Sequence, residues 1–487
     1  MKLIFEKSVK GRRAYRLPPL DVPEQPLEEL LPEEYLREEL NLPEVSQLEA
    51  VRHYTNLSRL NYAVDTTMVP LGSCSMKYNP RLHEELASLP AFTSAHPLTP
   101  PEAVRPLLEL AYELKELLKE LGGFAEVCLQ PAAGAQGELL GLLLIKAYHE
   151  ERKEDRPVVL VPDTAHGTNP ATASMCGYEV KVVKSDAKGE LDEEDLKKKL
   201  TGKVAALMLT NPNTLGIFER KVKKVARMLH EKGALLYMDG ANFNALVGRF
   251  KPGEWGVDVM HFNLHKTFSA PHGGGGPGAG PVGVSKRLVP YLPVPRIVKE
   301  NGEVTLKWDE PKSVGKLLAF WGHFTVWLKA LAYCLTYGKE IERVSRFAVL
   351  NARYLRRLLK GLFKDPYEGV PCMHEFVLSA SNLLKYGVRA YDVAKRLLDY
   401  GFYAPTVYFP LTVKEALMIE PTETESPQTL EAFAKALASI VREAKSKPEL
   451  LKEAPFTTPV ARINEAEANR RPVLRWEHGG SEAREGE

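Results

Sequence analysis

Short apolar segments alternate with helical patterns between residues 102 and 285, and this alternation constrains the fold more than any other feature of the sequence. The segments with the composition of buried strands are VVLVP (158–162), YEVKVV (178–183), VAALMLT (204–210), ALLYMD (234–239), VDVMHF (257–262) and PVGVS (281–285). Helical patterns lie at 102–121, 135–151, 191–200 and 221–233. Strands that alternate with helices form a mostly parallel sheet whose two faces are covered by those helices. The sequence therefore predicts an α/β domain of this kind.

The rest of the chain is arranged around this predicted domain. A chain of 487 residues is too long for one compact core and is expected to divide into domains. We predict an N-terminal arm and loop segment at 1–95, a large domain at 96–340, a small α/β C-terminal domain at 341–455 and a polar, extended tail at 456–487. Two further expectations are a mostly looped segment at 51–80 and one long helix over 318–345 that bridges domains.

The composition argues against several classes of protein. The net charge of +2 gives no electrostatic reason to expect nucleic acid or a membrane surface as a partner. No apolar run reaches the ~18 residues that a spanning helix needs, and the first residues lack the apolar core of a signal peptide. The five cysteines are scattered without CxxC spacing, which favours reduced thiols over disulfides or a metal site. We therefore expect a cytoplasmic protein.

Candidate site residues, most of them polar, follow the predicted strands at the ends where parallel sheets bind their ligands. These residues are His166 after 158–162, Asn211 after 204–210, Asp239, Ala241 and Asn242 at and after 234–239, and His265, Lys266 and Thr267 after 257–262. Because the carboxyl ends of parallel strands lie at one edge of a sheet, we expect these side chains to converge there.

Lys266 is the candidate for covalent chemistry at this edge. It precedes a glycine-rich stretch (273–280), and since glycine is costly to order, that stretch is expected to serve a ligand or a moving loop. A lysine amine at a strand end suits Schiff-base formation with an aldehyde, although most lysines are simply solvated. The carboxylate of Asp239 could keep a pyridine nitrogen protonated, which makes pyridoxal phosphate an electron sink. A structural acid or a helix cap is the alternative for Asp239.

Other residues at this edge suit the ring of such a cofactor. The imidazole of His166 could stack on the ring face opposite Ala241 or Asn242, or move protons near the substrate carbon. A hydrogen-bonded structural histidine is the alternative. Asn211 is a candidate partner for the ring hydroxyl.

A phosphate group has a candidate site at the start of a predicted helix. Gly134, Ala135 and Gln136 begin that helix, and its free N–H groups and dipole favour an anion. His265 and Thr267 are expected to add phosphate contacts. The glycine run is not a Walker loop, because no G-K-[ST] follows it.

These segments together resemble the P-protein family of the glycine cleavage system, which are pyridoxal phosphate-dependent glycine decarboxylases. The motifs that carry the resemblance are LGSCSMKYNP (71–80), QPAAGAQGE (130–138), DTAHGTNPATA (163–173), TNPNTLGIFE (210–219), MDGANFNA (238–245), NLHKTFSAPHGGGGPG (263–278), MHEFVLS (373–379), FYAPTVYFP (402–410) and MIEPTETES (418–426). The resemblance covers most of the chain, from about residue 50 to residue 450.

The resemblance implies a type I pyridoxal phosphate fold, with Lys266 as the Schiff-base lysine, Asp239 at the ring nitrogen and His166 stacked on the ring. In this family the enzyme is one long chain or two half-length subunits, and this length is similar to that of the lysine-bearing subunit 2. The implied partners are a homologous half-length subunit 1, the substrate glycine and the lipoylated H-protein. The lipoyl arm of the H-protein receives the aminomethyl group.

A lipoyl arm needs a channel, and the expected walls are the loop at 65–80 and the glycine-rich loop. The candidate channel residues are Ser73, Cys74, Ser75, Lys77 and Asn79. Cys74 is either a reactive thiol or a small packed residue. Two rival functions stay open: another type I pyridoxal phosphate enzyme, such as an amino-acid decarboxylase or aminotransferase, and a non-catalytic scaffold subunit of the same fold.

Overall fold

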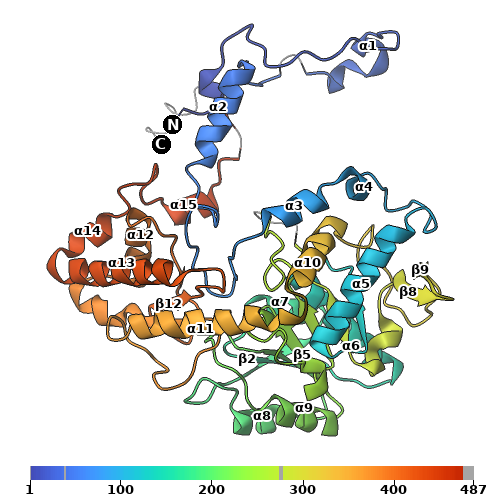
Figure 1. Cartoon of the computed structure of the whole chain (residues 1–487), viewed down its shortest axis with the longest axis vertical. Coiled ribbons are helices and arrows are strands. Elements are labelled where there is room, and N and C mark those ends of the chain that lie inside the picture. The colour runs from blue at the N-terminus through green and yellow to red at the C-terminus, as the bar shows by residue number, and fades with distance from the viewer. Residues whose placement is uncertain (1, 38–39, 274–277, 475, 477–487) are drawn as a thin grey trace. The chain divides into compact units, whose positions relative to one another are not determined.

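The computed structural model describes residues 2–37, 40–273, 278–474 and 476. Figure 1 shows the helices and strands of the chain. The chain forms two compact units, one of Met1–Ala63 with Glu453–Glu487 and one of Val64–Lys452. All of the predicted site residues belong to the second unit. The finer division of the chain at residues 95, 340 and 455 stays a prediction.

A seven-stranded sheet forms the centre of the Val64–Lys452 unit. Its strands are β1 (Glu126–Cys128), β2 (Val158–Pro162), β3 (Glu179–Val183), β4 (Val204–Thr210), β5 (Leu235–Gly240), β6 (Val259–Phe262) and β7 (Val282–Val284). They lie in the order β1-β7-β6-β5-β4-β2-β3; β2 to β6 run parallel, whereas β7 and β1 pair antiparallel. The predicted α/β class with a mostly parallel sheet is confirmed, and only β1 was not foreseen.

Helices cover both faces of this sheet. Leu207 and Leu209 of β4 belong to one hydrophobic cluster and Ala206 and Met208 to another, so the two clusters lie on opposite faces. The first cluster includes residues of α5 (Arg105–Gly122), α8 (Glu193–Lys199), α9 (Val222–Glu231) and α10 (Phe324–Tyr337). The second includes residues of α6 (Gly134–Glu151) and α7 (Thr168–Met175). The predicted covering of both faces is therefore observed.

The C-terminal part of the chain is built on a small antiparallel sheet. Its strands, in spatial order, are β10 (Phe376–Ser379), β12 (Ala416–Ile419) and β11 (Thr406–Val407). The neighbouring helices are α11 (Glu342–Leu358), α12 (Ala390–Asp399), α13 (Pro427–Ser446) and α14 (Pro448–Glu453). A separate hydrophobic cluster joins strand residues such as Phe376 and Leu417 to Leu355, Leu397 and Phe433 of these helices.

One expectation about local structure is wrong, and one pair of strands was not predicted. The single helix over 318–345 is broken, because Gly338 has a φ of 50° and its N–H bonds to the Cys334 carbonyl, which ends α10. A hairpin of β8 (Arg296–Glu300) and β9 (Glu303–Lys307) was not foreseen. Its turn residues, Asn301 and Gly302, both have positive φ, as the Asn-Gly sequence favours.

The unit of Met1–Ala63 and Glu453–Glu487 contains α1 (Leu27–Leu30), α2 (Gln47–Ser58) and α15 (Glu465–Arg470). The expected loop from residue 51 is therefore helical at its start. Ser46 and Glu49 form a capping box, in which Ser46 N–H donates to Glu49 Oε2 at 2.9 Å and Glu49 N–H donates to Ser46 Oγ at 3.3 Å. The tail that was expected to be extended includes the short helix α15.

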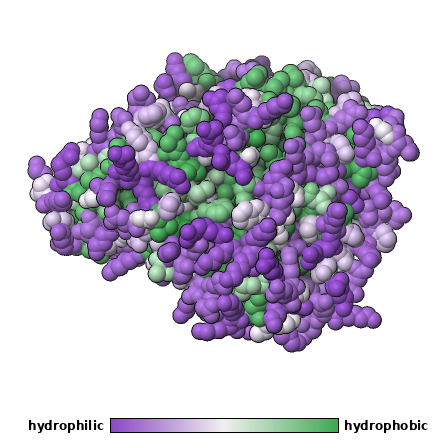
Figure 2. Space-filling model, turned by 60° about the horizontal axis from the view of Figure 1, so that its bottom comes forward, coloured by the Kyte–Doolittle hydropathy of each residue, from purple (hydrophilic) through white to green (hydrophobic). Residues whose placement is uncertain are grey.

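The surface of the molecule is mostly polar in the view of Figure 2, where hydrophilic residues predominate and hydrophobic residues form smaller groups. Within the described part of the chain, no helix combines the length and the apolar character that crossing a membrane requires.

Candidate functional site

Three neighbouring parallel strands end where the predicted residues lie. The register pairs Thr210 of β4 with Asp239 of β5, and Asp239 with His261 of β6. A cavity of about 160 Å³ opens at this edge. The predicted residues that line it are Ser73, Gly134, Ala135, His166, Asp239, Ala241, Asn242, His265 and Lys266. The convergence expected from a parallel sheet is therefore present.

Lys266 lies in the turn that follows β6. Its Nζ atom donates a hydrogen bond of 2.6 Å to the carbonyl oxygen of Ser73. The side chain is therefore held at the cavity by a loop that is remote in sequence, rather than extended into solvent.

Asp239 is the last residue but one of β5 and is only 2% exposed. One carboxylate oxygen accepts from Asn169 Nδ2 at 2.9 Å and the other from the Ala241 N–H at 2.8 Å. Burial by itself would raise the pKa of Asp239, but the His261 ring, these two hydrogen bonds and the Lys266 ammonium together hold that pKa below its ordinary value. Asp239 is thus an ionised carboxylate at the cavity wall.

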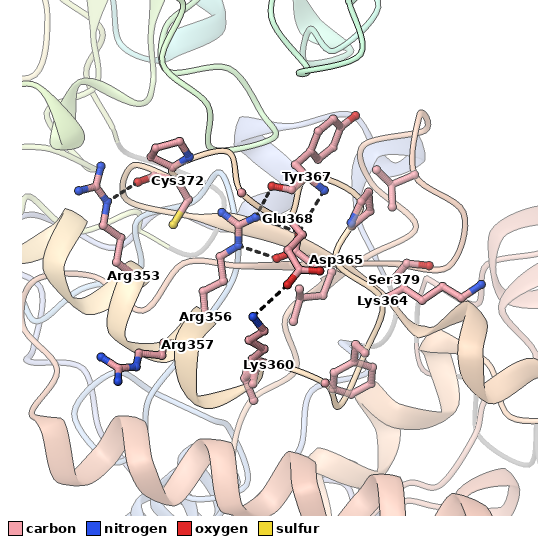
Figure 3. A pocket seen from close by; sticks show the side chains of 18 of the residues that line it. Arg353, Arg356, Arg357, Lys360, Lys364, Asp365, Tyr367, Glu368, Cys372 and Ser379 are labelled. Carbon is pink, nitrogen blue, oxygen red and sulfur yellow. Dashed lines mark hydrogen bonds and ion pairs between the residues drawn. The ribbon is translucent and has the colours of Figure 1, made fainter.

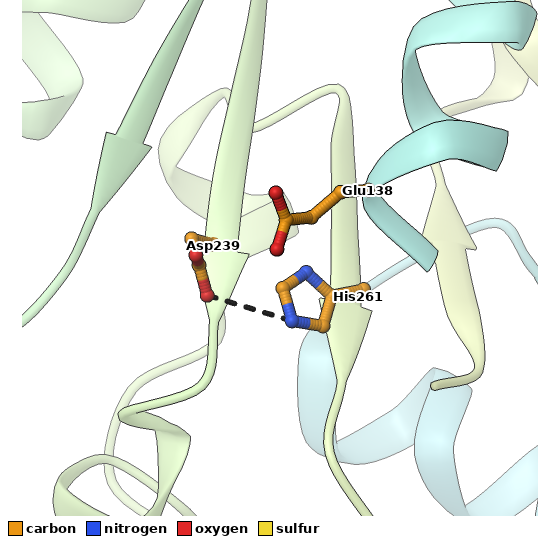
Figure 4. Close-up of side chains that lie close together, drawn as sticks. All are labelled: Glu138, Asp239 and His261. Carbon is orange, nitrogen blue, oxygen red and sulfur yellow. Dashed lines mark ion pairs between the residues drawn. The ribbon is translucent and has the colours of Figure 1, made fainter. Parts of the chain in front are cut away.

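Two buried groups beside Asp239, Glu138 and His261, were missed by sequence reasoning. Figure 4 shows Glu138 from α6 and His261 from β6 turned toward Asp239. Burial, and then the charge of Asp239, raises the pKa of Glu138 to about 7. The three side chains offer metal-ligand atoms within 4.8 Å of one another, but the amide of Asn169 already bridges the two carboxylates. The sequence did offer an indication for Glu138: it lies four residues, or one helical turn, after Gly134, which places both residues on the same side of α6.

His166 lies on the cavity wall and is otherwise exposed. Its Nδ1 atom is 2.8 Å from the Thr168 hydroxyl, and its ring meets the Phe409 ring edge-on at 5.9 Å. The imidazole ring thus lies at the cavity wall between a hydroxyl group and an aromatic ring.

The start of α6 reaches the cavity through Gly134 and Ala135. A Cβ atom on Gly134 would lie 2.4 Å from Asn263 Oδ1, so only glycine fits there without displacing that side chain. Gln136 does not line the cavity; its Oε1 accepts from the Ala132 N–H at 2.6 Å. The N-terminal N–H groups of α6 are therefore better placed than the Gln136 side chain to meet an anion in this cavity.

Asn211, His265 and Thr267 differ in how they relate to the cavity. His265 lines it, and burial lowers the pKa of its ring to about 3, so the ring is neutral. Asn211 and Thr267 are buried and do not line it. Asn211 Oδ1 accepts from the Glu219 N–H at 3.0 Å, whereas Asn211 Nδ2 and Thr267 Oγ1 have no hydrogen-bond partner among the described residues.

Most of the predicted channel residues point away from the cavity. Lys77 Nζ is buried and bonds to Glu423 at 2.5 Å, to the Thr267 carbonyl at 2.8 Å and to Tyr333. Asn79 Nδ2 donates to the Ser269 carbonyl at 2.8 Å. These side chains fix the loop in place, and the hydrogen bond from the loop to Lys266 comes from the backbone carbonyl of Ser73.

A second buried cluster, His374, Glu375 and Glu420, anchors the same loop and was also missed. Glu375 accepts from the Ser73 N–H at 2.7 Å, and Glu420 accepts from the Ser75 hydroxyl and N–H at 2.5 and 2.9 Å. Burial raises the pKa of both glutamates and lowers that of His374 to about 3. The signal was present in the segments MHEFVLS and MIEPTETES, which carry these three residues.

The GGGG run lies almost wholly outside the described residues, since only Gly273 is described. The glycine-rich wall of the expected channel therefore stays a prediction.

The thiol of Cys74 is half-buried, and burial raises its pKa despite the nearby Lys266.

A larger cavity of about 950 Å³ lies beside α11 (Figure 3). Its basic side chains are partly paired: Arg356 bonds to Asp365 at 2.8 Å, and Lys360 lies 3.1 Å from Glu368. It shares no described lining residue with the site around Lys266. The two cavities are therefore separate features.

Comparisons with known proteins agree with this geometry. Family models match at 140–275, "Aminotransferase class-V", and at 344–454, "Glycine dehydrogenase, C-terminal domain". Over 477 residues the chain is 73% identical to "Probable glycine dehydrogenase (decarboxylating) subunit 2" of Aquifex aeolicus, covering 98% of this chain and 99% of that protein. The chain belongs to the glycine dehydrogenase (decarboxylating) subunit 2 family. A protein of the same name from Caldanaerobacter subterraneus subsp. tengcongensis is 56% identical, covering 97% of this chain and 98% of that one.

A solved structure shares the fold of this family member. It is described as glycine decarboxylase (P-protein) of the glycine cleavage system in inhibitor-bound form, with a TM-score of 0.71 and 21% identity. The match covers 85% of this chain and 94% of that one. The expected type I pyridoxal phosphate fold is confirmed.

Pyridoxal phosphate is the cofactor of this fold, and the cavity fits it. The wall offers an amine on Lys266, an ionised carboxylate on Asp239 and the N-terminus of α6. Thr210 Oγ1 is a buried polar atom at the same wall that has no partner among the described residues, so it is free to bond to a ligand.

Proposed function

We propose that this chain is the catalytic, lysine-bearing subunit of a glycine-decarboxylating enzyme of the glycine cleavage system. The observation that carries the proposal is that Asp239, near the end of β5, and Lys266, in the turn after the adjoining strand β6, line one cavity. Its support is the 73% identity to a named subunit 2 along nearly the whole chain. In this proposal Lys266 is the covalent attachment point for the cofactor, and the α6 N-terminus holds the phosphate.

The side chains of the cavity suit removal of the glycine carboxylate. When bound, pyridoxal phosphate supplies an electron sink for the pair that is released as the carboxylate leaves. Asp239 is ionised and would keep the ring nitrogen protonated. His166 lines the cavity, where it would lie against the ring and could give or take a proton at its free ring nitrogen. The Ser73 carbonyl holds the Lys266 amine while that amine carries its protons.

The proposal includes two protein partners. The relatives are named as subunit 2, which supports a homologous half-length subunit 1 as the first partner. The second is the lipoylated H-protein, whose lipoyl arm takes the aminomethyl group. The loop around Ser73 is the proposed wall for that arm, because its backbone contacts Lys266. The five unpaired cysteines suit a cytoplasmic location, where thiols stay reduced.

Two measurements test the proposal. Borohydride reduction of the purified chain with pyridoxal phosphate should fix the cofactor on Lys266, read by peptide mass mapping, with Lys286→Gln as a control at an exposed lysine. Glycine–bicarbonate exchange should then require Lys266, subunit 1 and the lipoylated carrier together. Label on another lysine would overturn the site. Labelling at Lys266 without exchange would favour the scaffold alternative, and exchange with larger amino acids would favour a different decarboxylase.

A further inference from the structure

A chain of hydrogen bonds leads from the cavity to a buried carboxyl group. Nδ1 of His166 lies 2.8 Å from Oγ1 of Thr168, and that hydroxyl lies 2.8 Å from Oε1 of Glu138. The other oxygen of Glu138 accepts from Asn169 Nδ2 at 2.9 Å. His166 is exposed at the cavity, whereas Glu138 is 3% exposed. A hydroxyl group thus connects an accessible imidazole to a carboxyl group that water barely reaches.

The direction of these hydrogen bonds depends on the proton of Glu138. A protonated Glu138 donates to Thr168 Oγ1, and the Thr168 hydroxyl then donates to Nδ1 of His166. The Thr168 N–H, 3.3 Å from the same nitrogen, donates to it as well. A neutral His166 then carries its proton on Nε2. An ionised Glu138 reverses the chain: Thr168 donates to Glu138, His166 donates from Nδ1, and Nε2 is left as a proton acceptor.

We propose that Glu138 stores a proton that Thr168 relays to His166 and that His166 delivers to the cavity from Nε2. This inference rests on the proposed function, in which a proton must reach the carbon that loses carbon dioxide. Three bonds break, Nε2–H of His166, O–H of Thr168 and O–H of Glu138. Three form, a bond from hydrogen to the acceptor, Nδ1–H of His166 and a new O–H on Thr168. His166 stays neutral, Glu138 ends as a carboxylate, and no oxidant or reductant takes part.

The surroundings of Glu138 suit a group that both gives and takes a proton. Burial and then the charge of Asp239 raise the pKa of Glu138 to about 7, against the hydrogen bonds of Thr168 and Asn169 and the charge of Lys266. Near neutral pH both of its protonation states are therefore populated. The titratable groups near it are Asp239, Tyr237, His261 and Lys266, and His166 lies beyond the Thr168 hydroxyl. Asp239 beside it is held ionised, so the two carboxyl groups have different tasks.

Glu138 acts through Thr168 and His166 and is therefore a positioning residue. Its test must measure a property that would not change if Glu138 only stabilised the fold. Diethyl pyrocarbonate acylates an unprotonated ring nitrogen, and its rate at each histidine can be followed by mass spectrometry. In the purified full-length chain, the rate at His166 should rise in a step near pH 7, when Nε2 loses its proton. The residues around the cavity partly shield the His166 ring from water, which lowers the pKa of that ring, so the ordinary step of the imidazole lies at lower pH.

Matched variants separate the relay from general damage. Glu138→Gln and Thr168→Val should remove the step near pH 7, whereas Thr168→Ser keeps a hydroxyl and should preserve it. Glu150→Gln, at an exposed site on the same helix, and the exposed His96 in the same digest should show no change. The relay is overturned if the step survives in both Glu138→Gln and Thr168→Val, or if Thr168→Ser loses it as Thr168→Val does.

A second readout uses the assembled enzyme with its partner subunit and lipoylated carrier. The pH profile of kcat for glycine–bicarbonate exchange should lose its limb near pH 7 in Glu138→Gln and Thr168→Val and keep it in Thr168→Ser. An exchange-competent enzyme with unchanged profiles in both variants would overturn the relay and leave the proposed function standing. An acylation step that depends on Glu138 in a chain without exchange activity would support the relay and reject the proposed function.

Discussion

The amine of Lys266 donates a 2.6 Å hydrogen bond to the carbonyl oxygen of Ser73, although the two residues are 193 positions apart. The Ser73 N–H donates in turn to Glu375, and Ser73 has a φ of 64°. A non-glycine residue in this left-handed region is strained and persists only when its surroundings hold it. The Lys266 amine is therefore positioned by a loop, and the loop is positioned by buried carboxyl groups.

Removing the anchor at Glu420 should loosen this loop. Glu420→Ala leaves the N–H and hydroxyl of Ser75 without their acceptor, and each buried donor left unpaired costs about 1–3 kcal/mol. Hydrogen exchange of residues 71–79 should become at least ~10-fold faster, since 1.4 kcal/mol corresponds to a factor of ten. Glu420→Gln keeps an acceptor oxygen and should show a smaller effect, and Glu449→Ala, at an exposed site, none. Equal exchange in the wild type and Glu420→Ala would refute the anchoring role.

Asp239→Asn should retain the cofactor but lose turnover. The amide has the shape of the carboxylate, yet it carries no charge to keep a ring nitrogen protonated, so kcat should fall by about 10²-fold or more. Cofactor affinity, measured by absorbance titration, should change far less, because Lys266 and the α6 N-terminus are intact. Wild-type turnover in Asp239→Asn would exclude the proposed contact with the ring nitrogen.

The sheet could be predicted because its strands are continuous apolar runs. The runs at 158–162 and 204–210 coincide with β2 and β4, since both faces of those strands are buried. The errors lie where local signals outweigh periodicity. Gly338 interrupts an otherwise continuous apolar helical pattern. The Asn301-Gly302 sequence indicates a turn and the Ser46–Glu49 spacing indicates a helix start, but both patterns are only two to four residues long and were not used in the prediction.

The site could be predicted only in part, for a physical reason. Lys266, Asp239 and His166 follow strands, and a parallel sheet brings strand ends together whatever the tertiary details. The contact of Lys77 with Glu423 and that of Ser73 with Glu375 join segments that are hundreds of residues apart, and no local pattern encodes such pairs. Without knowledge of the distant Glu423, Lys77 was expected to line a channel. In the structure its amine is buried in an ion pair with Glu423.

Lys77→Met should act on stability rather than on substrate binding. The change leaves Glu423 buried without its cation, and breaking a buried ion pair in this way costs about 3–5 kcal/mol. Urea unfolding should show that loss, while KM for glycine of the folded enzyme should stay close to the wild-type value. Lys203→Met removes an exposed pair with Asp155 and should cost less than about 1 kcal/mol. A raised KM with unchanged stability would instead return Lys77 to the channel.

Cys74 should behave as a packed residue and not as a reactive thiol. Burial raises the pKa of its thiol, and although the nearby Lys266 opposes this, the balance favours the protonated and unreactive form at neutral pH. Alkylation of Cys74 by iodoacetamide at pH 8, followed by peptide mass mapping, should be much slower in the folded chain than in urea. Cys74→Ala should keep glycine–bicarbonate exchange within about twofold of wild type. Attack on a lipoyl disulfide would need a thiolate, and the Cys74 thiol stays protonated. Rapid alkylation together with loss of exchange in Cys74→Ala would show that the thiol takes part in the chemistry of the lipoyl disulfide.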